Sequence, residues 1–246
     1  LRIIFLNGLN MEIMQNLDCA CVLLLSGGQD STTCLFWAKN NFKQVHCIAF
    51  DYGQKHKVEL EAAKKIAKLA VVPLEIIEVK NIFGQSSLTD YSIDSNDNHV
   101  QDKTLPASFT AGRNMLFLSI AATYAHRIGC SHIVTGVCET DFSGYPDCRR
   151  VFIDAMETAL TLAIYNNINQ NYTIHTPLMY LTKAETWRLA KELSTQDIDV
   201  VKVVRSMTVT DYNGDLTQND WGVGRLDNPA SVLRKAGYDE AVQKGW

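Results

Sequence analysis

Apolar residues in the first eighty positions fall into short runs that alternate with helix-like stretches. Residues 21–25, 44–50 and 74–79 are rich in Val, Ile, Leu, Phe and Cys, which is typical of strands in a parallel sheet. Residues 55–70 instead repeat apolar side chains at helical spacing, and a helix is predicted over residues 31–38. Strands that alternate with helices predict βαβ units and a parallel sheet covered by helices.

The rest of the chain continues this alternation after one long polar loop. Residues 81–112 are rich in Asp, Asn and Ser, and we interpret them as a flap over a site. Further helices are predicted over residues 113–128, 149–165, 182–193 and 230–235, with another near Asp239. Further strands are predicted over residues 131–135 and the valine-rich residues 200–204. Thr182 and Glu185 have the spacing of a capping box.

This order of elements predicts the fold class and its division. We expect an α/β fold with a Rossmann-like parallel sheet flanked by helices over residues 19–205, and a small C-terminal module of helix and loop over residues 206–246. Ligands of such sheets bind beyond the carboxyl ends of the strands, where the segment after residue 25 and Asp51 both fall. A ligand site is therefore predicted at that edge.

Length, composition and charge exclude several classes of protein. The 246 residues suffice for one large α/β domain with an appendage, and 46% hydrophobic residues argue against disorder. The net charge of −4 argues against a nucleic-acid partner. No apolar run approaches the ~20 residues of a membrane span. The seven cysteines are odd in number and include no C-x-x-C pair, which is typical of reduced thiols in the cytoplasm.

The first fifteen residues have no clear place in this fold. They carry one Arg and a short apolar run but no A-x-A-like cleavage site, so a signal peptide is disfavoured. We expect residues 1–10 to be an upstream mis-start or a tag remnant before Met11.

The loop after the first buried strand has the composition of a phosphate-binding loop. Gly27 and Gly28 let the backbone turn sharply, and a helix follows directly, with Asp30 or Ser31 as its expected N-cap. The free N–H groups and positive dipole end of that helix suit a polyphosphate. The loop SGGQDS fits neither GxxxxGK[ST] nor GxGxxG, and an ordinary glycine-rich turn is the alternative.

Three further polar clusters fall at the ends of predicted elements. Asp51 begins the first, DYGQKH, and Arg113 and Asn114 begin a helix in the second. Residues 136–149 form the third, which holds acids, a tyrosine and an arginine in one loop. Taken alone, Asp51 as a turn residue and Arg113 as a surface charge stay open. The mixture in the third cluster is rare in a solvated loop, so we interpret it as part of a site.

Together these motifs carry a specific resemblance. SGGQDS resembles the signature of the PP-loop ATP pyrophosphatases, which have an adenine nucleotide alpha hydrolase-like fold. SGGQDSTTC, DYGQKH followed by Glu59, GRN and SGYPDCR are together similar to the family of 7-cyano-7-deazaguanine synthases, which act in queuosine biosynthesis. SGYPDCR separates this branch from NAD synthetases, GMP synthetases and tRNA thiolases. The resemblance also implies a homodimer, and the reduced cysteines predict a cytoplasmic location.

The resemblance implies a ligase that uses ATP to form carbon–nitrogen bonds. ATP would adenylate 7-carboxy-7-deazaguanine, ammonia would convert the adenylate to an amide, and a second activation would give 7-cyano-7-deazaguanine. Mg²⁺ and backbone N–H groups would bind the pyrophosphate. Two alternatives stay open: a related amide-forming ligase on another carboxylate, and an inactive nucleotide-binding paralogue. A tRNA-thiolating enzyme is disfavoured, because the chain has no C-x-x-C pair and no basic tail.

The motif residues then take expected roles. The nucleotide-binding set is Leu25, Ser26, Gly27, Gly28, Gln29, Asp30, Ser31, Thr32, Asp51, Tyr52, Gly53, Gln54 and Gly136. The catalytic set is Ser26, Asp30, Ser31, Arg113 and Lys183. The substrate-binding set is Arg113, Asn114, Asp141, Tyr145, Asp147 and Arg149. In these sets the arginines would hold a carboxylate or phosphate, and the acids would accept from the N–H edge of a purine-like ring.

The C-terminal module departs from the family's pattern. Members carry four cysteines that bind a structural zinc, but here the matching positions are Asp211, Arg225, Asn228 and Ser231. A Cys₄ site cannot form without these thiols, so zinc is doubtful and no metal ligand is assigned. We expect the four side chains to converge, with Asp211 and Arg225 as an ion pair between the two segments. Drift of all four to ordinary surface residues is the alternative.

Overall fold

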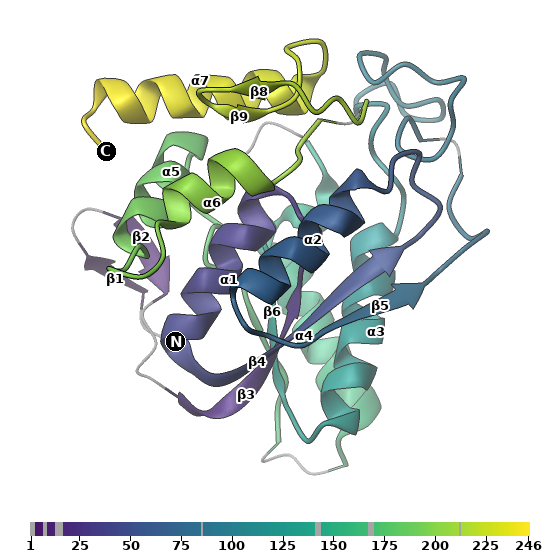
Figure 1. Cartoon of the computed structure of the whole chain (residues 1–246). Helices are drawn as coiled ribbons and strands as arrows, with labels where there is room; N and C mark the ends of the chain where they lie inside the picture. Colours follow the sequence, from purple (N-terminus) through teal and green to yellow (C-terminus); the bar gives the residue numbers. More distant parts are fainter. Residues whose placement is uncertain are drawn as a thin grey trace.

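A five-stranded parallel sheet forms the centre of the molecule (Figure 1). The computed structural model describes residues 3–6, 9–12, 17–84, 86–140, 144–166, 170–211 and 213–246, the first two segments as backbone only. The strands are β3 (Leu17–Leu24), β4 (Phe42–Asp51), β5 (Leu74–Glu78), β6 (His132–Val134) and β7 (Thr173–His175). They lie in the order β5-β4-β3-β6-β7, so the order reverses between β3 and β6. Two short antiparallel pairs complete the strands: β1 (Ile3–Leu6) with β2 (Leu9–Glu12), and β8 (Gln218–Asn219) with β9 (Gly222–Val223).

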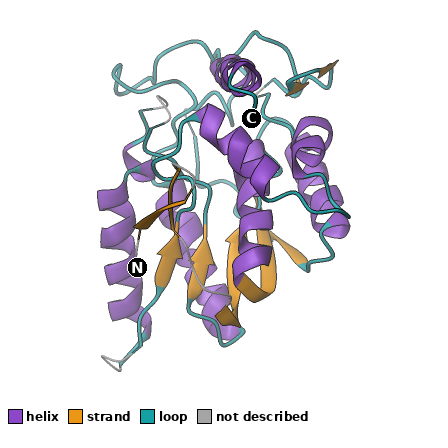
Figure 2. Cartoon of the chain, turned by 90° about the vertical axis from the view of Figure 1, so that its left-hand side faces the viewer, coloured by secondary structure: helices purple, strands orange, loops and turns teal. Residues whose placement is uncertain are grey.

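Helices cover both faces of this sheet (Figure 2). On one face α1 (Gln29–Asn41), α2 (Val58–Leu69), α5 (Lys183–Glu192) and α6 (Val200–Met207) share a core with Leu23. On the other face α3 (Arg113–Arg127) and α4 (Arg150–Ile164) share a core with Val22. Val22 and Leu23 are both fully buried because successive side chains of a strand point to opposite faces. This burial on both faces explains the continuous apolar run from which the strand was predicted.

The C-terminal segment lies against the helices of the first face. Helix α7 (Pro229–Gln243) packs on α5, and with β8 and β9 it lies along the top of the view in Figure 1. A short 3₁₀ helix, η1 (Pro146–Cys148), precedes α4. None of the helices in the described part of the chain has the length and apolar character needed to span a bilayer.

The prediction of a strand over the valine-rich residues 200–204 is wrong, because these residues lie in helix α6. Val200, Val203 and Val204 are buried, which is helical rather than alternating spacing. Asp199 caps the helix by accepting the backbone N–H of Lys202 at 2.9 Å. The fifth strand is instead β7, whose three residues are too few to give a clear periodic pattern.

Two helix ends also differ from the prediction. Gly28, rather than Asp30 or Ser31, occupies the N-cap of α1, which begins at Gln29. The two predicted short C-terminal helices are one continuous helix, α7. It runs through Gly237, where a side chain would meet Lys183 of α5, so this glycine permits close packing rather than ending a helix. The capping box at Thr182 and Glu185 is confirmed.

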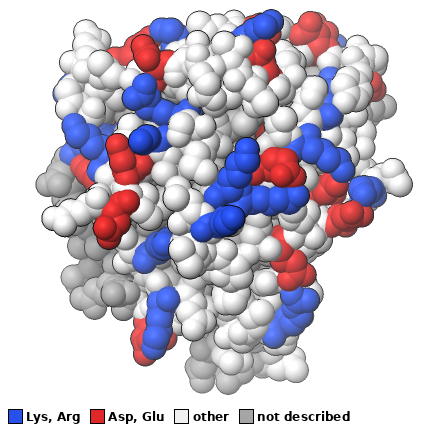
Figure 3. All heavy atoms as spheres, in the orientation of Figure 1, with Lys and Arg blue, Asp and Glu red and all other residues white. Residues whose placement is uncertain are grey.

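The surface carries charges of both signs. On the face shown in Figure 3, Lys and Arg side chains are interspersed with Asp and Glu. A face that binds a nucleic-acid backbone is expected to gather basic residues in one stripe. The mixture of positive and negative side chains on this face does not form such a stripe.

Candidate active site

A cavity of about 780 Å³ lies at the carboxyl ends of β3, β4 and β6. Its walls come from the loop of residues 25–31, the turn after β4, the first turns of α2 and α3, and the C-terminal module. Residues of the 81–112 segment also line it, as expected of a flap. The sheet order reverses beside β3, and this is the edge where open α/β sheets bind ligands.

The loop of residues 25–31, here called the phosphate loop, is held in shape by its own hydroxyl groups. The Oγ atoms of Ser26 and Ser31 lie 3.0 Å apart, and the backbone N–H of Gly28 donates to Ser26 Oγ at 3.3 Å. Thr32 Oγ1 donates to the Gly28 carbonyl at 2.8 Å. The N-terminus of the 13-residue helix α1 thus opens onto the cavity without a side-chain cap. Such a terminus favours a polyphosphate.

Gly27 makes this loop fit against α2. Its φ of +89° lies in the left-handed region, and a Cβ atom there would stand 2.2 Å from the Glu59 carbonyl oxygen. Only glycine satisfies both requirements. The phosphate loop and the first turn of α2 therefore touch backbone to backbone.

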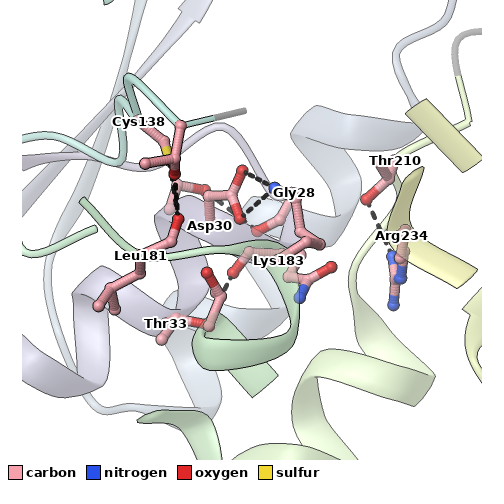
Figure 4. A network of polar contacts seen from close by, with 12 residues as sticks. Gly28, Asp30, Thr33, Cys138, Leu181, Lys183, Thr210 and Arg234 are labelled. Atoms are coloured by element: carbon pink, nitrogen blue, oxygen red, sulfur yellow. Dashed lines mark hydrogen bonds and ion pairs between the residues drawn. The ribbon is translucent and has the colours of Figure 1, made fainter. Parts of the chain in front are cut away.

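Asp30 and Lys183 form the main ion pair of the cavity (Figure 4). Lys183 Nζ lies 3.0 Å from both carboxylate oxygens of Asp30, although 153 positions separate them in the sequence. The Lys183 side chain is only 11% exposed. On its other side Gly237 of α7 lies so close that a Cβ atom would stand 2.6 Å from Lys183 Cγ. The fold thus brings together two predicted catalytic residues, and α7 supports the lysine.

Gln29 is a buried amide beside the cavity. It is 3% exposed, and among the described residues neither its amide nitrogen nor its amide oxygen has a hydrogen-bond partner, although buried amides are normally satisfied. The donors that face the cavity are instead the open N-terminus of α1, the Ser26 and Ser31 hydroxyls and the Lys183 ammonium group. This set of donors fits the phosphates of ATP.

The DYGQ segment after β4 forms a tight polar turn. Gln54 accepts the Tyr52 N–H at 2.9 Å and donates to the Phe50 carbonyl at 3.1 Å. Asp51 accepts Lys57 Nζ at 2.9 Å, and this hydrogen bond lowers the pKa of its carboxyl. Tyr52 and Gln54 line the cavity, whereas Asp51 stands behind it as an anchor of the turn.

Arg113 begins α3 and faces the cavity opposite the phosphate loop. Its guanidinium lies 5.8 Å from the centre of the Tyr52 ring. Burial raises the pKa of Glu59 to about 7 and raises the pKa of Asp147, and the charge of Arg113 opposes both shifts. The next residue, Asn114, donates its backbone N–H to Asp147 Oδ2 at 3.3 Å. One cation thus stands among acids that burial makes weaker.

The predicted residues divide into three groups. Those that line the cavity are Leu25, Ser26, Gly28, Gln29, Asp30, Ser31, Tyr52, Gln54, Arg113, Asn114, Gly136, Tyr145 and Lys183. Those that the structure places outside its lining are Gly27, Thr32, Asp51, Gly53, Asp147 and Arg149. Arg149 is exposed at the N-cap of α4. Asp141 lies outside the described residues.

Several residues line the cavity although the sequence did not assign them to the site. Glu59 and Phe117 line it from α2 and α3, and Thr210, Asp211 and Arg234 line it from the C-terminal module. Glu59 follows DYGQKH by one turn, and this spacing was the available signal. Asp211 was expected only as one of the four positions that match the zinc cysteines, and Thr210 and Arg234 gave no local signal because the packing of the C-terminal module brings them to the cavity.

The C-terminal module is fastened by a buried arginine. Arg234 is 1% exposed and donates to Thr210 Oγ1 at 2.9 Å and to the carbonyls of Val204 and Trp221 at 2.7 and 3.2 Å. The first of these bonds is visible in Figure 4. Burial lowers its pKa to about 10, so the guanidinium stays charged at neutral pH. Three elements are thus joined through one side chain.

The four positions that match the family's zinc cysteines do come together in part. Asp211 is 1% exposed and accepts the backbone N–H groups of Asn213 at 2.7 Å and Arg225 at 2.9 Å. Ser231 Oγ lies 3.4 Å from Asp211 Oδ2, and the Asn228 side chain caps α7 through the Ser231 N–H at 3.0 Å. The expected Asp211–Arg225 ion pair is wrong: Arg225 Nε pairs with Asp215 at 2.9 Å.

This donor set does not fit a structural zinc. Zinc sites use thiolates, imidazoles or carboxylates in sets of three or four. Among the residues that the structure describes, no group of three or more His, Cys, Asp or Glu side chains is placed to hold a metal ion. The Asp211 carboxylate is instead engaged by N–H and hydroxyl donors.

Removing Asp211 should destabilise the protein far more than removing Arg225. Asp211→Ala removes a buried carboxylate and leaves two partly buried N–H donors and the Ser231 hydroxyl without that acceptor, at up to about 1–3 kcal/mol for each. Arg225→Ala removes a guanidinium whose side chain is 67% exposed, so its effect should be small. Urea unfolding of both variants and of the double mutant measures this, and the effects should add because the two side chains do not touch. Equal losses, or one zinc per chain by elemental analysis, would contradict this description.

The fold and the cavity first define a class of protein. A phosphate loop of sequence SGGQDS at the reversal of a parallel sheet makes this an α/β nucleotide-binding protein of the PP-loop type. The family model described as "Queuosine biosynthesis protein QueC" matches residues 20–242, and the chain belongs to this family. The resemblance drawn from the four motifs is confirmed.

Curated relatives carry one shared name. The protein from Bacteroides fragilis named 7-cyano-7-deazaguanine synthase is 47% identical over 227 residues, which cover 92% of this chain and 97% of the relative. Relatives of the same name from Phocaeicola vulgatus and Lysinibacillus sphaericus are 46% and 45% identical, over 90% and 89% of this chain and 94% of each relative. Among solved structures, NMN synthetase from Francisella tularensis matches 91% of this chain and 85% of its own, at 14% identity and a TM-score of 0.45.

Proposed function

We propose that this chain converts 7-carboxy-7-deazaguanine, ATP and ammonia into 7-cyano-7-deazaguanine. The observation that carries the proposal is one continuous cavity. It joins the phosphate loop and its Asp30–Lys183 pair to the part of the wall formed by Arg113, Asn114 and Tyr145, here called the Arg113 pocket. Family membership and the shared name of the curated relatives support it. A carboxylate is a poor electrophile, and such a cavity can hold it beside the α-phosphate of ATP.

The phosphate loop supplies the nucleotide end of this reaction. Backbone N–H groups at the start of α1 and the hydroxyls of Ser26 and Ser31 bind the pyrophosphate, and Lys183 contributes the positive charge. Mg²⁺, when bound, would neutralise the departing pyrophosphate, and Asp30 is the carboxylate of the loop that fits it. The Asp30–Lys183 pair keeps both groups oriented before ATP arrives.

The Arg113 pocket binds the second substrate, 7-carboxy-7-deazaguanine. Arg113 holds the carboxylate of the substrate through its planar guanidinium. Tyr145, whose hydroxyl is hydrogen-bonded to Ser108, and Asn114 face the deazaguanine ring from the same cavity. Asp147 fixes Asn114 from behind at 3.3 Å. Asp141, which lies outside the described residues, and Arg149 at the N-cap of α4 remain proposed members of the substrate-binding set.

Asp147→Ala should weaken the binding of 7-carboxy-7-deazaguanine while leaving the binding of ATP unchanged. The variant removes the carboxylate that accepts the Asn114 N–H, so it disturbs the ring pocket but not the phosphate loop. Loss of such a partner costs roughly 1–3 kcal/mol, or about 5- to 150-fold in affinity. Calorimetry with each ligand measures the two effects separately. Loss of ATP affinity with the deazaguanine affinity retained would reverse the assignment.

The reaction itself is tested by product analysis. The purified protein is incubated with ATP, Mg²⁺, ammonium and 7-carboxy-7-deazaguanine, and mass spectrometry follows the amide and the nitrile. The proposal expects the nitrile with AMP and pyrophosphate. Accumulation of the amide alone would favour an amide-forming ligase, and no ATP cleavage would favour an inactive nucleotide-binding paralogue. We further propose that the chain forms a homodimer, which light scattering would test. We also propose that residues 206–246 form a separate module, which limited proteolysis would test.

A further inference from the structure

We propose that Glu59 is the base that takes protons from nitrogen in this cavity, first from the attacking ammonia and then from the amide. This inference rests on the proposed function and names a catalytic group that the phosphate loop does not supply. It follows from the position of Glu59, from the state of the other acids in the cavity and from its charged neighbours.

Glu59 stands where the two ends of the reaction meet. Glu59 lines the cavity from the first turn of α2, and its backbone carbonyl lies against Gly27 of the phosphate loop. Arg113, which holds the substrate carboxylate in the proposed reaction, is the charged group that acts on it. In the proposed reaction the carbonyl carbon under attack lies between the phosphate loop and Arg113, and Glu59 is a wall residue of that same cavity.

The other acids of the cavity are engaged or remote from this position. Four acidic residues of the described chain line it: Asp30, Glu59, Asp97 and Asp211. Asp30 is paired with Lys183, and Asp211 accepts backbone N–H groups. Asp97 lies in the flap and is exposed. Among the described residues no hydrogen bond or ion pair reaches the Glu59 carboxylate, which leaves its oxygens available to a ligand.

The surroundings of Glu59 make it a suitable base near neutral pH. Burial raises the pKa of Glu59 to about 7, and the positive charge of Arg113 limits the rise. A general base works best when its pKa is near the working pH. Tyr52 faces Glu59 from the end of β4, and burial raises its pKa to about 12, so it stays neutral. Lys55 and His56 line the same cavity from the turn before α2.

The proton balance requires a base in both halves of the reaction, amide formation and nitrile formation, and Glu59 acts in each. Ammonia attacks the acyl-adenylate carbon, a C–N bond forms, the C–O bond to AMP breaks, and the surplus proton on nitrogen passes to the Glu59 carboxylate. Glu59 returns that proton to water. In the second half the amide oxygen attacks the α-phosphate of another ATP and expels pyrophosphate, while one N–H proton passes to the Glu59 carboxylate and from there to water. The remaining N–H proton passes to Glu59 as the C–O bond to AMP breaks and the nitrile forms, and Glu59 again returns it to water.

Glu59→Gln separates this role from binding. The variant keeps the size and polarity of the side chain but cannot take up a proton. We expect the exchange of labelled pyrophosphate into ATP, which depends on 7-carboxy-7-deazaguanine, to stay within about threefold of wild type. Formation of amide and nitrile should fall by about 10²- to 10⁴-fold. Glu61→Gln is the matched control, since Glu61 is an exposed residue of the same helix that pairs with Lys64, and it should behave as wild type.

A pH profile at constant free ammonia provides the second readout. Amide formation by wild type should rise with pH through about 7, where Glu59 loses its proton, and Glu59→Gln should lose this rise. Glu59→Asp should retain the rise at a lower rate. If Glu59→Gln forms nitrile like wild type, or loses pyrophosphate exchange together with amide formation, the base assignment is wrong. If wild type itself forms no product, the proposed function fails instead.

Discussion

Replacing Asp30 with alanine should reduce turnover by about 10²-fold or more while the fold stays intact. The carboxylate fixes Lys183 at 3.0 Å through both of its oxygens, beside the N-terminus of α1. Without it the lysine loses the partner that orients it beside the phosphate loop, and a bound Mg²⁺ would lack the carboxylate that we propose for it. Ser26→Ala should act in the same direction, because Ser26 accepts the Gly28 N–H inside the loop.

The measurement is the release of pyrophosphate at saturating ATP, with circular dichroism and urea unfolding as checks of the fold. Asp18→Ala provides the control: Asp18 also pairs with a lysine, Lys43, but its side chain is 84% exposed. It lies at the start of β3, whereas the phosphate loop follows the end of that strand. This control should keep wild-type turnover. Wild-type activity in both Asp30→Ala and Ser26→Ala would remove the phosphate loop from the mechanism.

Gly27→Ala should weaken ATP binding strongly and destabilise the protein. The added Cβ atom would stand 2.2 Å from the Glu59 carbonyl, a backbone atom that cannot rotate away, and the φ of +89° disfavours any side chain. The phosphate loop must then move away from α2. We expect a loss of about 1–3 kcal/mol from the overlap, about 1–2 kcal/mol from the backbone conformation, and at least about 10²-fold in ATP affinity.

Gly129→Ala separates the two causes. Gly129 has a φ of +70°, but no atom lies within 4 Å of the position that a Cβ would take. This variant should show the conformational cost alone in urea unfolding, with unchanged ATP affinity by calorimetry. If Gly27→Ala binds ATP like Gly129→Ala does, the close contact between the loop and α2 is not required for binding.

The sheet and the phosphate loop could be predicted because their signals are local. A buried strand, two glycines and a helix start lie within about fifteen consecutive residues, and the strands on either side repeat the pattern. Residues 200–204 were assigned wrongly because β-branched valines favour strands, whereas the burial of Val200, Val203 and Val204 on one helical face decided the outcome. Tertiary packing outweighed local propensity there.

Contacts between distant parts of the chain also limited what the sequence could predict of the candidate site. Lys183 could be placed near ATP only through the family resemblance, because 153 positions separate it from Asp30. Asp211 and Arg225 were expected to pair as opposite charges, but the backbone N–H of Arg225 reaches Asp211 while its guanidinium turns to Asp215. The pair was predicted from the charges of the two side chains, whereas Arg225 contacts Asp211 through its backbone N–H, which the residue type does not reveal. Thr210 and Arg234 reach the cavity through the packing of α7, which no local pattern records.

The central claim is that one cavity adenylates a carboxylate and releases it as a nitrile, and isotope transfer tests it most directly. The protein is given 7-carboxy-7-deazaguanine with ¹⁸O in both carboxylate oxygens, together with ATP, Mg²⁺ and ammonium, and the products are analysed by mass spectrometry. Each C–O bond that breaks leaves its oxygen on AMP, so every AMP should carry one ¹⁸O, two AMP should form per nitrile, and pyrophosphate should stay unlabelled. ADP with labelled inorganic phosphate, or AMP without label, would contradict the account.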